Sequence, residues 1–231
     1  MKNIISFARF LMIIFLAFFS SVFFWTLVYL DKVMEKKISL WSRVAISHLV
    51  IIIVVSSILI IMPGGLRAWG INIRDWRKSL LLGLFSGLSI GILFSLFSYG
   101  TNIYRWNLMK LMTSIRSKEN IVQLLTQLFL VGTSEELFFR GLLVTYLMRK
   151  YSKKLLGIHS GIIIISAMCG LLQFYKLLFG ATLGNISALA VGGFVYSIWL
   201  GLIYQKTGSL FGPILAHNLG NSLMVLGGLG V

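Results

Sequence analysis

The chain has 231 residues, of which 58% are hydrophobic and only 12% are charged, and its mean hydropathy is +0.92. This composition excludes an ordinary soluble domain. The net charge of +15 does not indicate a nucleic-acid-binding protein, because the basic residues form short clusters between long apolar runs, as is typical of loops beside anionic lipid. We therefore expect an integral membrane protein whose partners include membrane lipid and no nucleic acid.

Long apolar stretches dominate the sequence. A helix that crosses the hydrocarbon layer needs about 20 mostly apolar residues. We expect an all-α fold, a polytopic membrane helix bundle of about seven transmembrane helices, with residues 1–231 forming a single membrane domain. The glycine-rich last stretch leaves six spans and a re-entrant segment as an alternative. The predicted spans are 8–30, 44–63, 80–102, 121–147, 158–179, 186–204 and 210–230.

Two further segments carry structural signals. Gly83, Gly87 and Gly91 recur one helical turn apart in the third span, which predicts close packing against another helix. Residues 105–120 place apolar residues at helical spacing among basic ones, which indicates a helix that lies in the membrane interface. The basic residues are slightly more numerous in the loops that lie on the same side as the N-terminus, which favours a cytoplasmic N-terminus.

The stretch SEELFFRGLL puts Glu135, Glu136 and Arg140 inside the fourth span. A charge at the centre of a bilayer costs at least about 2.5–3.5 kcal/mol, so such residues usually face a partner, a cavity or a functional site. Glu136 and Arg140 lie four residues apart, on one face of a helix, and can pair. Glu135 is rotated by about 100° from Glu136 and points elsewhere. A purely structural ion pair is the alternative interpretation.

Two other spans carry polar pairs at the same spacing. GPILAHNLGNSL contains His217 and Asn221, and SAMCGLLQFYKL contains Cys169 and Gln173. A single histidine is more often a packing residue than a catalyst. A carboxylate, an imidazole and a carboxamide that share a partly dry cavity can nevertheless activate water and stabilise an oxyanion, which is the chemistry of amide hydrolysis.

Together, SEELFFRGLL and TGSLFGPILAHNLGNSL resemble the CPBP family of intramembrane proteases, which includes the CAAX prenyl endopeptidases and the bacterial Abi proteins. The family pattern is EExxxR, FxxxH and HxxxN on three helices. The first element is matched by Glu135, Glu136 and Arg140, and the third by His217 and Asn221. The resemblance covers a family-like core of about residues 66–225, including the lead-in AWGINIRDWRKSLLLGL.

The resemblance implies a role for each matched residue. Glu135 would be the general base for water, and Glu136 and Arg140 its supporting ion pair. His217 and Asn221 would be the electrophilic partners that polarise the substrate carbonyl.

The second family element is where the chain departs from the pattern. ISAMCGLLQF places Cys169 where the family has Phe and Gln173 where it has His. If the site is metal-assisted, Glu135 and His217 are possible ligands of a divalent metal such as zinc, and Gln173 is a poor third ligand. If the site uses water activated by glutamate alone, Gln173 can still donate a hydrogen bond.

Two functions remain open from the sequence. The first is a protease of the bacterial cell membrane that hydrolyses a peptide or membrane-protein substrate. The alternative is a catalytically impaired pseudoprotease that binds peptides as a bacteriocin-immunity or regulatory protein. A small transporter is disfavoured, because the sequence shows neither inverted halves nor paired broken helices.

Overall fold

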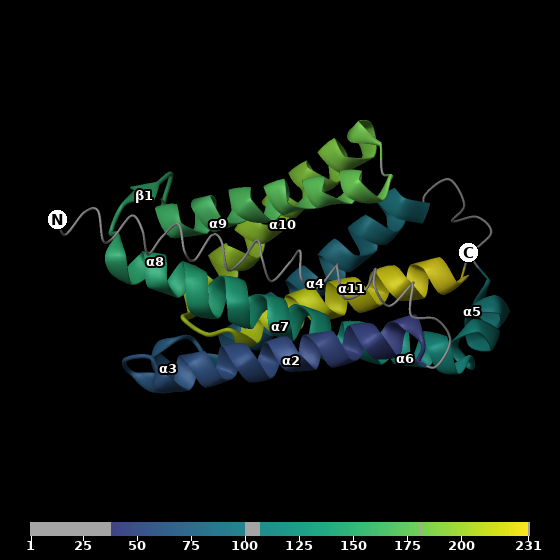
Figure 1. The fold of residues 1–231 in the computed structure, drawn as a ribbon, viewed down its shortest axis with the longest axis horizontal. Helices are drawn as coiled ribbons and strands as arrows, with labels where there is room; N and C mark the ends of the chain where they lie inside the picture. The colour runs from purple at the N-terminus through teal and green to yellow at the C-terminus, as the bar shows by residue number, and fades with distance from the viewer. Residues whose placement is uncertain (1–37, 100–106, 181, 231) are drawn as a thin grey trace.

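The computed structural model describes residues 38–99, 107–180 and 182–230, and this part of the chain is a helical bundle. In Figure 1, α9 and α10 form its upper edge, α2 and α3 form its lower edge, and α11 runs between them. The helices are α2 (Leu40–Ile61), α3 (Gly65–Ala68), α4 (Trp76–Tyr99), α5 (Leu108–Ile115), α6 (Lys118–Thr126), η2 (Gln127–Val131), α7 (Gly132–Glu136), η3 (Leu137–Val144), α8 (Thr145–Lys150), α9 (Ser160–Leu171), η4 (Leu172–Phe179), α10 (Leu183–Thr207) and α11 (Phe211–Gly230).

Helices occupy six of the seven predicted spans, and the first, residues 8–30, lies outside the described residues. Among the described helices, three are long and apolar enough to cross a membrane by themselves: Leu40–Ile61, Trp76–Leu96 and Ile186–Thr207. The count of seven spans is therefore not confirmed. The fourth predicted span is divided among the short helices α6, η2, α7, η3 and α8, and in the fifth the apolar helix Ser160–Phe174 is too short.

One feature differs from an all-helical fold. Strands β1 (Lys154–Leu155) and β2 (Ile158–His159) form a small antiparallel hairpin between α8 and α9. Gly157, with a φ of +78°, allows the tight reversal. His159 ends the hairpin and caps α9, because its Nδ1 accepts a hydrogen bond from the Gly161 amide at 3.0 Å.

The core lies around η3. Leu143, Val144 and Leu147 are almost fully buried and pack with Ile162 and Ile165 of α9. Many apolar side chains elsewhere are exposed, among them Ile53, Leu81 and Val191. Exposed apolar surface on this scale is typical of helices that contact lipid rather than water.

The predicted glycine seam is confirmed and packs α4 against α11. A methyl group on Gly83 would lie 2.9 Å from the Gly212 carbonyl oxygen, and one on Gly87 would lie 3.0 Å from the Ala216 carbonyl oxygen. The absence of side chains lets the two backbones approach this closely. α11, which carries His217, is thereby held in a fixed register along α4.

Gly83→Ala is expected to destabilise the protein by about 1–3 kcal/mol, because the new methyl group meets backbone that cannot rotate away. Gly184→Ala on α10 is the matched control, since a methyl group there would find nothing within 4 Å. The measurement is the free energy of unfolding of each variant in mixed micelles. Equal stability of the two variants would contradict the close packing of α4 against α11 at Gly83.

Candidate functional site

The acids of SEELFFRGLL lie on a helical stretch with unusual local geometry. α7 has five residues and contains Glu135 and Glu136. π-helical turns precede and follow it, η2 over Gln127–Val131 and η3 over Leu137–Val144. Such π turns occur frequently at functional sites, where they change the direction in which side chains project.

Glu136 and Arg140 form a buried ion pair. Arg140 Nη1 donates to Glu136 Oε1 at 3.0 Å, and the two side chains are 3% and 0% exposed. Arg140 Nη2 also donates to the carbonyl oxygen of Ser197 at 2.7 Å and to its hydroxyl oxygen at 2.8 Å. The pair joins η3 to α10 and compensates a charge that would otherwise be very costly at this depth.

His217 lies between the two glutamates. Its Nδ1 is 2.9 Å from Glu136 Oε1, and its Nε2 is 3.8 Å from Glu135 Oε2. Since the Glu136 carboxylate only accepts hydrogen bonds, Nδ1 carries the proton and donates it. The imidazole is therefore anchored on one side by Glu136 and presents Nε2 to Glu135.

The two adjacent acids have different surroundings. Glu136 is completely buried, whereas 42% of the Glu135 side chain is exposed. The 3.8 Å between Glu135 Oε2 and His217 Nε2 is too long for a direct hydrogen bond and short enough for one bridging water oxygen to reach both atoms. A carboxylate and an imidazole on either side of one water form an arrangement that can activate it.

Asn221 and Gln173 are less closely joined to the site than the four residues Glu135, Glu136, Arg140 and His217 are to one another. Asn221 is half-buried one turn after His217, and Gln173 is half-buried at the start of η4. Gln173 contacts α10, where its Nε2 lies 3.7 Å from the position of a methyl group on Gly193. Within residues 107–180 and 182–230, no hydrogen bond joins either carboxamide to Glu135 or His217.

Two residues that belong to none of the sequence motifs, Tyr196 and Asn218, also border the site. The Tyr196 ring packs edge-on against the His217 imidazole, with ring centroids 5.2 Å apart and planes at 78°. Asn218 Nδ2 donates to Thr133 Oγ1 at 3.1 Å. Asn218 adjoins His217 in HNLGN, but the four-residue spacing favoured Asn221, and no motif singles out Tyr196.

Three buried polar atoms near His217 have no hydrogen-bond partner in the described part of the chain: Glu136 Oε2, Tyr196 Oη and Asn218 Oδ1. A buried polar atom without a partner costs free energy, so such atoms are rare and tend to gather at catalytic sites or bind internal water. Their concentration around one imidazole distinguishes this region from an ordinary packed core.

Glu135 and His217 do not by themselves make a catalytic zinc site. Such sites use three protein ligands and leave one position open. Among the residues that the structure describes, no three His, Cys, Asp or Glu side chains lie close enough to hold an ion. The described side chains thus do not supply the three ligands that a metal-assisted site would need.

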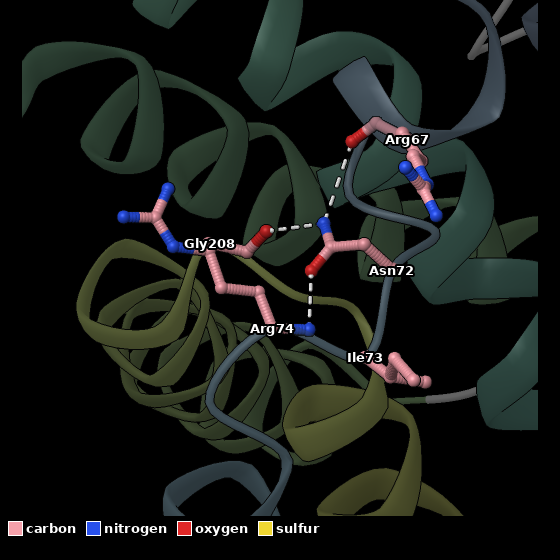
Figure 2. Close-up of a pocket in the computed structure, with 5 residues that line it drawn as sticks. All are labelled: Arg67, Asn72, Ile73, Arg74 and Gly208. Carbon is pink, nitrogen blue, oxygen red and sulfur yellow. Dashed lines mark hydrogen bonds between the residues drawn. The ribbon is translucent and has the colours of Figure 1, made fainter.

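A separate hollow of about 390 Å³ lies at the end of the bundle, and it is lined by Arg67, Asn72, Ile73, Arg74 and Gly208. Figure 2 shows the guanidinium groups of Arg67 and Arg74 on opposite sides of Asn72. The side-chain carboxamide of Asn72 already has hydrogen-bond partners. Its Nδ2 donates to the Gly208 carbonyl oxygen at 2.9 Å, and its Oδ1 accepts from the backbone amide of Arg74 at 3.0 Å. This hollow contains none of the candidate catalytic residues.

Comparison with known proteins identifies one family. The model of the family "Type II CAAX prenyl endopeptidase Rce1-like" matches residues 117–223, a little under half of the chain. The match spans Glu135, Gln173 and His217 and agrees with the resemblance to the CPBP proteins. No curated protein and no solved structure matches the chain. The match and the apolar helices together identify an integral membrane protein.

Proposed function

We propose that this chain, which carries a region of the Rce1-like family of type II CAAX prenyl endopeptidases over residues 117–223, is an intramembrane endopeptidase that hydrolyses peptide bonds with water activated by Glu135. The observation that carries the proposal is the 3.8 Å separation of Glu135 Oε2 and His217 Nε2, with His217 anchored by a buried carboxylate on its other side. The substrate is a peptide or a membrane protein, and the location is a bacterial cell membrane with a cytoplasmic N-terminus.

The reaction uses the two glutamates for different tasks. Glu135 removes a proton from the water while the water oxygen bonds to the peptide carbonyl carbon. The negative charge that develops on the carbonyl oxygen is stabilised by hydrogen bonds from Asn221 and from the imidazolium form of His217, in which Nε2 carries a second proton. The proton held by Glu135 then passes to the leaving nitrogen as the carbon–nitrogen bond breaks. Glu136 and Arg140 keep the imidazole in place throughout.

Glu135→Gln tests this assignment. We expect kcat for a prenylated CAAX peptide to fall at least about 100-fold in proteoliposomes, because the amide cannot accept the proton from water. Asp75→Asn is the control, since Asp75 is exposed in the loop before α4 and its φ of +49° suits asparagine. Unchanged turnover in Glu135→Gln would remove Glu135 as the base.

A second function has one observation in its favour. Gln173 replaces the second-motif histidine, and its carboxamide makes no hydrogen bond to the other candidate residues that the structure describes. In this alternative, the chain is a pseudoprotease that binds a peptide in the former active site, as a bacteriocin-immunity or regulatory protein does. Substitution of Gln173 by histidine separates the two functions.

A further inference from the structure

A third histidine reaches the glutamate-bearing helix from outside the region that the family covers. His48 lies near the middle of α2, is 5% exposed, and belongs to none of the family motifs. Its Nδ1 is 2.5 Å from the hydroxyl oxygen of Ser134, which precedes Glu135 and is completely buried. α2 is thus joined directly to the turn that carries both glutamates.

The direction of this hydrogen bond follows from the partners of Ser134. Its hydroxyl proton is donated to the Val131 carbonyl oxygen at 2.8 Å. A serine hydroxyl has one proton, so its oxygen can only accept from His48. His48 therefore carries a proton on Nδ1 and donates it to Ser134.

The turn held by this bond is flanked on both sides by breaks in the regular α-helix. α7 contributes five residues between two π-helical turns, where the regular ladder of i to i−4 hydrogen bonds is interrupted. A small rotation of this turn would change the 3.8 Å between Glu135 Oε2 and His217 Nε2. A buried hydrogen bond from a neighbouring helix at Ser134 opposes such a rotation.

His48 belongs to a helix that packs directly against the glutamate-bearing turn, since α2 contacts α7. The Gln173 carboxamide, by contrast, contacts Gly193 of α10. In this chain a second imidazole therefore approaches the site from α2, while the position expected to supply one on η4 carries an amide.

We propose that His48 is a positioning residue that, through its hydrogen bond to Ser134, fixes the orientation of Glu135 toward His217. The contribution of His48 to catalysis rests on the proposed function, whereas its control of the orientation of Glu135 toward His217 does not. His48 acts through Ser134 and does not touch the substrate.

The kinetic test compares variants of the full chain in proteoliposomes. His48→Leu and Ser134→Ala each remove the hydrogen bond, and we expect kcat for a prenylated CAAX peptide to fall about 10- to 100-fold with KM nearly unchanged. The double variant should be no slower than either single variant, because both remove one interaction. In His48→Asn the side-chain amide can replace the Nδ1 donor, so most of the activity should return. Ser57→Ala, which removes a hydroxyl on the exposed face of α2, is the control.

A second measurement does not require hydrolysis. The chain has three histidines, so the imidazole nitrogens can be assigned by ¹⁵N NMR. We expect His48 in the wild type to show a protonated Nδ1, and the His217 signals to shift in His48→Leu and Ser134→Ala but not in His48→Asn. His159, which binds Tyr151 and Gly161 at the hairpin, should stay unchanged as an internal reference.

The two measurements separate the possible failures. If the wild type cleaves no peptide, the proposed function fails, and the NMR signals still decide whether His48 controls the site geometry. If Glu135→Gln is inactive while His48→Leu and Ser134→Ala keep wild-type kcat, the positioning role is wrong and the proposed function stands. Unshifted His217 signals in both variants would also overturn the positioning role.

Discussion

Glu136→Ala is expected to destabilise the protein by about 3–5 kcal/mol, because it leaves a buried cation without its counter-ion. The Arg140 side chain is only 3% exposed, and among the described residues it would keep its two hydrogen bonds to Ser197. His217 would lose the carboxylate that holds Nδ1. We therefore also expect kcat to fall at least about 100-fold, since Nε2 would no longer be directed at Glu135.

Unfolding in mixed micelles measures the first effect and peptide hydrolysis the second. Asp75→Asn is the control for loss of an exposed carboxylate charge, since asparagine also suits the φ of +49° at this position. The double variant Glu136→Ala/Arg140→Ala should be less destabilised than the sum of its single variants, because it buries no unpaired charge. If Glu136→Ala has the stability of Asp75→Asn, the ion pair contributes little and Glu136 does not hold Arg140 in the folded protein.

The helices could be anticipated from composition because apolar stretches of membrane length leave few alternatives. α10 and α11 fall close to the predicted ranges of 186–204 and 210–230. The seam of Gly83, Gly87 and Gly91 was predictable for a similar reason, since small residues one turn apart serve close backbone contact. Membrane crossing was harder to predict, because a helix such as α9 is apolar but ends after twelve residues.

The acidic part of the site was also visible in the sequence. The four-residue spacing of Glu136 and Arg140 predicted a pair on one helix face, and the two side chains lie 3.0 Å apart. The roles of Glu135, His217 and Asn221 in catalysis remain predictions. The four-residue spacing of His217 and Asn221 places both on one face of α11, but no spacing predicts how α7 and α11 rotate toward each other.

The rest of the site depends on contacts between helices, which no local pattern reports. π-helical turns on both sides of α7 have no sequence signature in QLFLV or LFFRGLLV. His48 is separated from Ser134 by 86 residues, and Tyr196 reaches His217 from α10. Such residues look like isolated polar or aromatic positions within apolar helices until the tertiary packing brings them together.

Gln173→His is expected to raise kcat about 10-fold or more, because an imidazole can transfer protons and a carboxamide cannot. Gln173 is half-buried on η4, and the neighbouring Gly193 of α10 has no side chain to oppose a ring of similar length. The expectation assumes that the wild type already cleaves slowly through Glu135. Hydrolysis of a prenylated CAAX peptide by wild type, Gln173→His and Gln173→Leu measures the effect.

The double variant Glu135→Gln/Gln173→His is the control, and it should be inactive if the gain depends on the same base. The pattern of activity distinguishes the two proposed functions. Slow wild-type cleavage that the histidine accelerates supports the protease. A wild type that binds peptide without cleaving it, together with a Gln173→His variant that cleaves, supports the peptide-binding pseudoprotease, because the missing imidazole would then be all that separates this site from an active one.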